Sequence, residues 1–279
     1  MKNIIVAIDF SKCSIRAIEY AIAIANKIEA NVSLVWVNKP NEFYADIDIY
    51  HKVQMDHARK NIELLVEKYK NELKKGVIDY KIRSGKVFEE IVNQAKYSDS
   101  YMIIAGTHGV SGFEEFWIGS NAYRIVSYSE IPVITIRCGF KTNDIRKIVV
   151  PIDCTLDTRQ KVPFVTELAK LYNAEVYITA INTTGQSDVN KLTEKYALQA
   201  KKYFDSNSVI NHYEHLKGDN ESKMIIDYAK KIDADLISMM TEQPINKLQA
   251  LLGSNAQALV NHSPIPVLSI KTIDTYEIK

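Results

Sequence analysis

The residues best suited to chemistry in this sequence lie in a glycine-rich stretch between residues 105 and 122. This stretch contains Gly106, Gly109, Gly112, Gly119, Ser120 and Asn121. Glycine adopts backbone conformations closed to other residues, so such a loop can turn several N–H groups toward one point. A helix that begins near Ser120 adds unpaired N–H groups and the positive end of its dipole. The stretch predicts an anion site that suits phosphate, and a plain turn is the alternative interpretation.

Three side chains in and near this stretch have more than one plausible role. His108 is either a phosphate contact, a proton-transfer group or a solvent-facing loop residue. Ser120 either caps the helix or donates its hydroxyl to a phosphate oxygen. Asp9 can bind a divalent metal, accept a ribose hydroxyl, or form a turn that stabilises the next helix. No Lys or Arg lies between Gly106 and Asn121, so backbone N–H groups have to carry the anion binding.

Apolar runs and helical periodicity alternate along the first half of the chain. Strands are predicted at residues 4–8, 32–37, 78–82, 101–105 and 133–136, with a long loop at 41–49. Ser11 is the predicted cap of the first helix. Buried strands separated by helices are typical of a parallel sheet wound on both sides, and ligands sit beyond its carboxyl strand ends. Asp9, Val37 and Gly106 should therefore meet at one edge of the sheet.

The chain repeats itself. Residues 4–9 recur at 148–153, residues 119–122 recur at 253–256, and residues 131–136 recur at 265–270. We therefore predict an α/β fold of two tandem doubly wound domains, each with a five-stranded parallel sheet, at 1–140 and 145–279.

Composition narrows the functional classes. The chain has 279 residues and a net charge of +1, so no basic surplus indicates binding to nucleic acid or to an anionic membrane. Its cysteines, Cys13, Cys138 and Cys154, are too few and scattered for a disulfide framework or a zinc site. No apolar run suits a signal peptide or a membrane span. A cytoplasmic location is the expectation.

The combined motifs resemble the universal stress protein family in both halves. They are Gly106-x-x-Gly109 followed after nine residues by Gly119-Ser120, the opening V-A-I-D-F-S and the closing P-V-I-T-I. The resemblance implies a tandem member with the adenine nucleotide α-hydrolase-like fold and ATP, with or without Mg²⁺, in the first half. It places Asp9 at the nucleotide and Val37 at adenine, with Gly106, Gly109, Gly119, Ser120 and Asn121 around the phosphates and ribose. It also implies an intrachain pseudo-dimer through residues 133–136 and 267–270, with homodimerisation left open.

The second half departs from the glycine pattern. When Gly253 is paired with Gly119, the residues that correspond to Gly106, Gly109 and Gly112 are Met240, Gln243 and Asn246. Pro244 also lies in this stretch, and it has no backbone N–H to donate. We expect this half to bind ATP weakly or not at all.

Three functions remain open at this stage. The first is an ATP-binding regulatory protein of the stress response with unidentified protein partners. The second is a slow ATP hydrolase or transferase, for which no second carboxylate, Lys or Arg is placed by the sequence. The third is an interaction protein without nucleotide.

Overall fold

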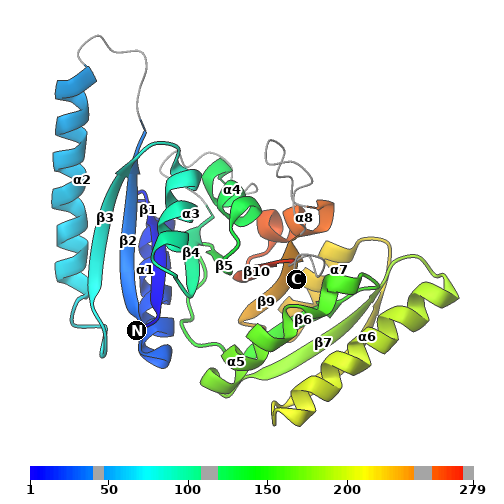
Figure 1. The fold of residues 1–279 in the computed structure, drawn as a ribbon. Coiled ribbons are helices and arrows are strands. Elements are labelled where there is room, and N and C mark those ends of the chain that lie inside the picture. Colours follow the sequence, from blue (N-terminus) through cyan, green and yellow to red (C-terminus); the bar gives the residue numbers. More distant parts are fainter. Residues whose placement is uncertain (40–46, 108–118, 242–252, 273–279) are drawn as a thin grey trace, which may run out of the picture. The chain divides into compact units, whose positions relative to one another are not determined.

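A computed structural model describes residues 1–39, 47–107, 119–241 and 253–272 (Figure 1). The chain divides into two compact units, Met1–Asn143 and Asp144–Lys279. Each unit is a parallel five-stranded sheet with helices on both faces. The predicted α/β, doubly wound architecture is therefore confirmed in both halves.

The first unit alternates strands and helices from end to end. Its elements are β1 (Asn3–Ile8), α1 (Lys12–Ile28), β2 (Asn31–Asn38), α2 (Ile47–Tyr69), β3 (Ile78–Ser84), α3 (Val87–Tyr97), β4 (Met102–Gly106), α4 (Ser120–Tyr128) and β5 (Val133–Ile136). The strand order is β3-β2-β1-β4-β5, so the winding direction reverses between β1 and β4. One expectation was wrong, because α2 begins at Ile47, inside the predicted loop at 41–49. The rest of that loop lies outside the described residues.

The apolar pattern explains how these layers form. The side chains from Ile4 to Val6 are fully buried, as expected for a strand covered on both faces. In α1, Ala17, Ala21 and Ala25 recur at four-residue spacing and are fully buried, because they form the stripe that packs on the sheet. The helices α1 and α2 cover one face, and α3 and α4 pack together on the other.

The second unit repeats the plan with one local change. Its elements are β6 (Lys147–Ile152), η1 (Leu156–Arg159), α5 (Val162–Tyr172), β7 (Glu175–Asn182), α6 (Ser187–Ser206), β8 (Asn211–Lys217), α7 (Glu221–Lys231), β9 (Leu236–Thr241), α8 (Ser254–His262) and β10 (Val267–Lys271). The order β10-β9-β6-β7-β8 again reverses beside the first strand. Its first α-helix has 11 residues, against 17 in α1, because a short 3₁₀ turn replaces the first turns. Pro163 stands at the new helix start, where its missing N–H is harmless.

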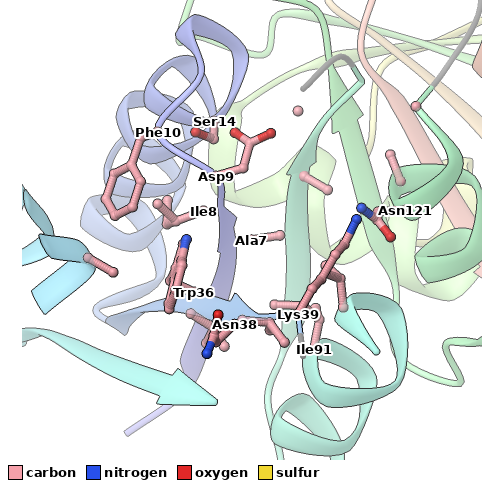
Figure 2. A pocket seen from close by; sticks show the side chains of 18 of the residues that line it. Ala7, Ile8, Asp9, Phe10, Ser14, Trp36, Asn38, Lys39, Ile91 and Asn121 are labelled. Atoms are coloured by element: carbon pink, nitrogen blue, oxygen red, sulfur yellow. The ribbon is translucent and has the colours of Figure 1, made fainter. Parts of the chain in front are cut away.

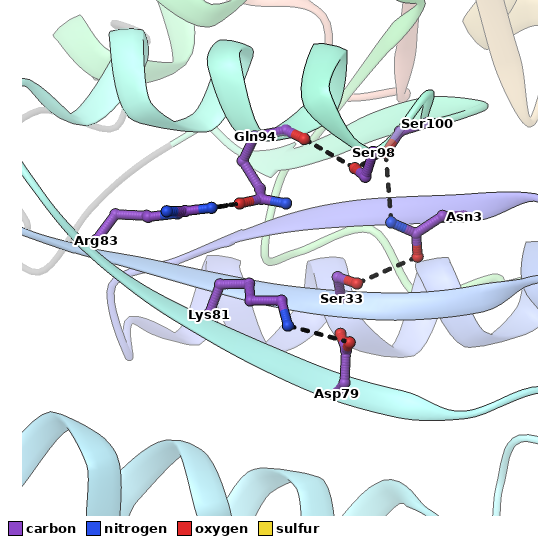
Figure 3. A network of polar contacts seen from close by, with 8 residues as sticks. All are labelled: Asn3, Ser33, Asp79, Lys81, Arg83, Gln94, Ser98 and Ser100. Atoms are coloured by element: carbon purple, nitrogen blue, oxygen red, sulfur yellow. Dashed lines mark hydrogen bonds and ion pairs between the residues drawn. The ribbon is translucent and has the colours of Figure 1, made fainter.

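A polar network ties the amino ends of neighbouring strands in the first unit (Figure 3). Asn3 donates from Nδ2 to Ser100 Oγ at 3.3 Å, and Ser33 Oγ donates to Asn3 Oδ1 at 3.2 Å. Ser98 Oγ lies 2.8 Å from Ser100 Oγ and donates to the carbonyl of Gln94 at 2.7 Å. These hydrogen bonds join the amino-terminal ends of β1, β2 and β4.

Arg16 fastens the segment after β5 to helix α1. Its side chain is buried, Nε donates to the carbonyl of Phe140 at 2.5 Å, and Nη2 donates to that of Thr142 at 2.6 Å. We expect Arg16→Met to lower the free energy of unfolding by about 2–3 kcal/mol, because hydrogen bonds from a charged group contribute more than neutral ones. Urea unfolding measures this change. The matched control is Lys12→Met on the exposed side of the same helix, and equal effects of the two changes would contradict the prediction.

Candidate functional site

A cavity of about 940 Å³ opens at the carboxyl edge of the first sheet (Figure 2). It lies where the strand order reverses between β1 and β4, the position at which doubly wound sheets bind ligands. Among the residues predicted from the sequence, the cavity is lined by Asp9, Val37, Gly106, Gly119, Ser120 and Asn121. His108 and Gly109 lie outside the described residues.

Asp9 follows the last residue of β1 and combines a turn with exposure to the cavity. The N–H of Ser11 donates to Asp9 Oδ1 at 3.0 Å, which is the turn-forming role. Ser11 in turn caps α1, because its side chain accepts from the N–H of Ser14 at 3.2 Å, as predicted. The turn uses only Oδ1 of Asp9, so the other carboxylate oxygen can contact a ligand while the turn is kept.

Gly106 lets the end of β4 approach the first turn of α1. A Cβ atom at this position would lie 2.7 Å from the carbonyl carbon of Cys13 and 2.9 Å from its oxygen. Backbone atoms cannot move aside as a flexible side chain can, so this close approach requires glycine. Cys13 itself is buried, which agrees with its interpretation as a packed thiol.

The first turn of α4 presents backbone donors without a side-chain cap. The cap residue is Gly119 and Ser120 is the first helical residue, so of the two roles considered for Ser120 the capping role does not apply. Gly119 has no side chain that could accept from the first turn, and this turn carries no acidic residue. A helix start of this kind, lining a cavity, can bind an anion with its N–H groups and its dipole.

The structure also brings a cation to the cavity that the local motif did not show. Lys39 directly follows β2, lines the cavity, and extends toward Asn121 (Figure 2). Lys39 lies outside the stretch from Gly106 to Asn121, in which the sequence has no Lys or Arg. The sequence did hold a signal, because Lys39 stands two residues after Val37, at a predicted strand end. Apolar side chains complete the wall, among them Val37, Ala58 and Ile91.

A second cavity, of about 480 Å³, lies at the equivalent edge of the second unit. Asp153, Ser254 and Asn255 line it, as their counterparts Asp9, Ser120 and Asn121 do in the first unit, but Met240 stands in place of Gly106. The positions Gln243, Pro244 and Asn246 lie outside the described residues.

Two charged residues distinguish this second cavity. Lys161 is 2% exposed, and its Nζ donates to the carbonyl of Thr158 at 2.6 Å. Burial lowers the pKa of Lys161 to about 8, although Asp153 and Glu221 oppose the shift. Burial, reinforced by the charge of Asp153, raises the pKa of Glu221 to about 7.

The described residues contain neither a membrane-spanning helix nor a metal-binding cluster. No helix there is both long and apolar enough to cross a bilayer. No three His, Cys, Asp or Glu side chains there are grouped so that they could hold a metal ion.

Several curated proteins and solved structures similar to this chain are described as universal stress proteins. Universal stress protein YxiE of Bacillus subtilis is 25% identical over 145 residues, covering 48% of this chain and 98% of its own. Universal stress protein MJ0531 of Methanocaldococcus jannaschii is 29% identical over 145 residues, which cover 49% of this chain and 82% of its own. A universal stress protein structure from Archaeoglobus fulgidus matches 96% of this chain and 98% of its own, with a TM-score of 0.80 and 18% identity.

The family assignment rests on the whole sequence. The pattern of the universal stress protein family matches residues 1–137 and again residues 144–271. The two matches correspond to the two repeated halves of the sequence. The chain therefore belongs to the universal stress protein family and carries its domain twice.

Proposed function

We propose that the first unit binds ATP and that the protein is a nucleotide-binding regulator of the stress response. The observation that carries this proposal is the meeting of three features in one cavity of about 940 Å³. They are the uncapped start of α4, the Lys39 ammonium and an apolar wall. Polyphosphate suits the first two features, and a purine ring suits the third.

Each part of ATP has a proposed partner. The adenine ring packs against Val37, as the resemblance to ATP-binding members implies. The phosphates accept hydrogen bonds from the first turn of α4 and from the amide of Asn121, and Lys39 neutralises part of their charge. Asp9 accepts a ribose hydroxyl with the carboxylate oxygen that its turn leaves available.

The second unit is proposed to bind ATP weakly or not at all. Met240 fills the position of Gly106, and the described lining of its cavity carries the carboxylates of Asp153, Asp157 and Glu221 against the single ammonium of Lys161. A negative lining repels polyphosphate. One ATP per chain is therefore the expected stoichiometry.

Titration calorimetry of the whole chain with ATP tests the proposal. We expect Lys39→Ala and Asn121→Ala each to weaken binding by about tenfold, because each removes a charged or charge-assisted hydrogen bond. Asn255→Ala, the counterpart of Asn121 in the second unit, is the matched control and should leave the affinity unchanged. Two ATP per chain, or equal effects of Asn121→Ala and Asn255→Ala, would overturn the proposal.

A turnover assay with labelled ATP separates regulation from hydrolysis. We expect no more product than the uncatalysed reaction gives, because the described lining of the cavity holds a single Lys, Lys39, and a single carboxylate, Asp9, and no Arg. Repeated turnover well above that rate would favour the hydrolase function instead.

A further inference from the structure

Two apolar positions of the first unit have become charged in the second. Counted from the paired Asp9 and Asp153, Lys161 occupies the position of Ala17. Counted from the first residues of α3 and α7, Glu221 occupies the position of Val87. Ala17 is buried and Val87 lines the first cavity, whereas Lys161 and Glu221 both line the cavity of the second unit. Ordinary packing does not require two opposite charges here, since the first unit folds without them.

The charged side chains are held in place by neutral neighbours. Lys161 Nζ donates to Thr158, with 2.6 Å to its carbonyl oxygen and 3.4 Å to Oγ1. Glu221 Oε2 accepts from Asn255 Nδ2 at 2.6 Å. Asp153 Oδ1 accepts from the backbone and the hydroxyl of Thr155, at 2.7 and 2.5 Å. One oxygen of each of these two carboxylates is therefore oriented by the protein, and the other can face a ligand.

The described lining of this cavity has an excess of negative side chains. It carries the carboxylates of Asp153, Asp157 and Glu221 and the single ammonium of Lys161. Burial is the main cause of the raised pKa of Glu221, and the negative charge of Asp153 adds to it. A ligand that brings a positive charge would relieve this excess. A volume of about 480 Å³ is far larger than a bare ion fills, so the suitable cation is an organic one.

We propose that the cavity of the second unit binds a small organic molecule through an ammonium group held between Asp153 and Glu221. A diamine and an amino acid both offer this group. In an amino acid, the carboxylate would meet the ammonium of Lys161. This site differs from the nucleotide site in place and in charge, and its existence does not depend on ATP binding by the first unit.

Titration calorimetry on the whole chain tests the site with two probes, putrescine and a mixture of the standard L-amino acids. We expect at least one probe to bind with one molecule per chain. Glu221→Gln should weaken this binding by about tenfold or more, because a charged hydrogen-bond partner is lost. Glu89→Gln, an exposed carboxylate on α3 of the first unit, should leave it unchanged. Binding of putrescine alone identifies a diamine site, and binding of the mixture alone identifies an amino acid site.

Two results would overturn the proposal. One is the failure of both probes to bind, and the other is binding that Glu221→Gln leaves unchanged in a variant with a normal circular dichroism spectrum. If Glu221→Gln does not fold, Asp153→Asn replaces it, because asparagine keeps the oxygen that accepts from Thr155. An ATP titration of the same samples reports on the first unit, so failure of either site is recognised separately.

Discussion

Replacing Gly106 by alanine is expected to destabilise the first unit and to weaken its binding of ATP. The added Cβ would lie 2.7 Å from the carbonyl carbon of Cys13, so the end of β4 and the start of α1 have to move apart. Overpacking of this kind costs about 1–3 kcal/mol of stability. Asp9, Gly106 and the first turn of α1 border the same cavity, so the displacement also misplaces groups around the nucleotide.

Thermal unfolding and ATP titration measure these two effects. Gly139→Ala is the matched control, because a Cβ at Gly139 would meet no atom within 4 Å. Both substitutions change one glycine to alanine, but only Gly106 stands at a close approach. If the two variants were equally stable and bound ATP equally well, the steric role of Gly106 would be refuted.

The double substitution Lys161→Ala and Glu221→Val is expected to stabilise the protein. It restores the two residues that the first unit has at these positions, Ala17 and Val87. Replacing buried ionic groups by well-packed apolar residues is often neutral or stabilising by about 1–4 kcal/mol. The gain is expected because the second unit holds these charges against the penalty of burial.

The stability gained by the double substitution should depend on pH, and the two shifted pKa values decide where it rises and where it falls. The pKa of Glu221 is raised to about 7, so the folded protein loses stability as pH rises from the ordinary glutamate value toward 7. The pKa of Lys161 is lowered to about 8, so stability returns as pH rises from 8 toward the ordinary lysine value. The stabilisation of the double variant should therefore be largest between about pH 7 and 8.

Urea unfolding at a series of pH values, with Lys161→Ala alone as the control, checks this expectation. The single change leaves Glu221 and Asp153 without their cation, so it should destabilise the protein above pH 7, unlike the double change. A double variant that is less stable than the natural chain, or a difference that does not vary with pH, would show that these charges support the fold.

The layers of the fold could be predicted from the sequence because buried strands and helices place apolar residues at regular spacings. The continuous apolar run at residues 4–8 and the three- and four-residue spacing after Ser11 required a buried strand and a helix packed on it. The rule that ligands lie beyond the carboxyl strand ends then brought Asp9, Val37 and Gly106 to one edge. All three line the first cavity.

What the sequence did not reveal depends on contacts between distant segments. Lys39 is not part of the glycine-rich stretch. It follows β2, and only the fold brings it to the same cavity as that stretch. Neither Lys161 nor Glu221 stood out, since a charged residue at a helix start usually faces solvent. Their burial becomes visible only when η1 and α7 are placed around one cavity.

The contact between Gly106 and Cys13 imposes an order on how two duplicated halves can diverge. While the first helix starts directly after the strand, any side chain at position 106 collides with its backbone. In the second half that start is replaced by a 3₁₀ turn, and Met240 is accommodated at the equivalent position. A methionine at this position therefore requires a changed helix start. Which residues fit at the end of the fourth strand thus depends on residues far away in the sequence, at the start of the first helix.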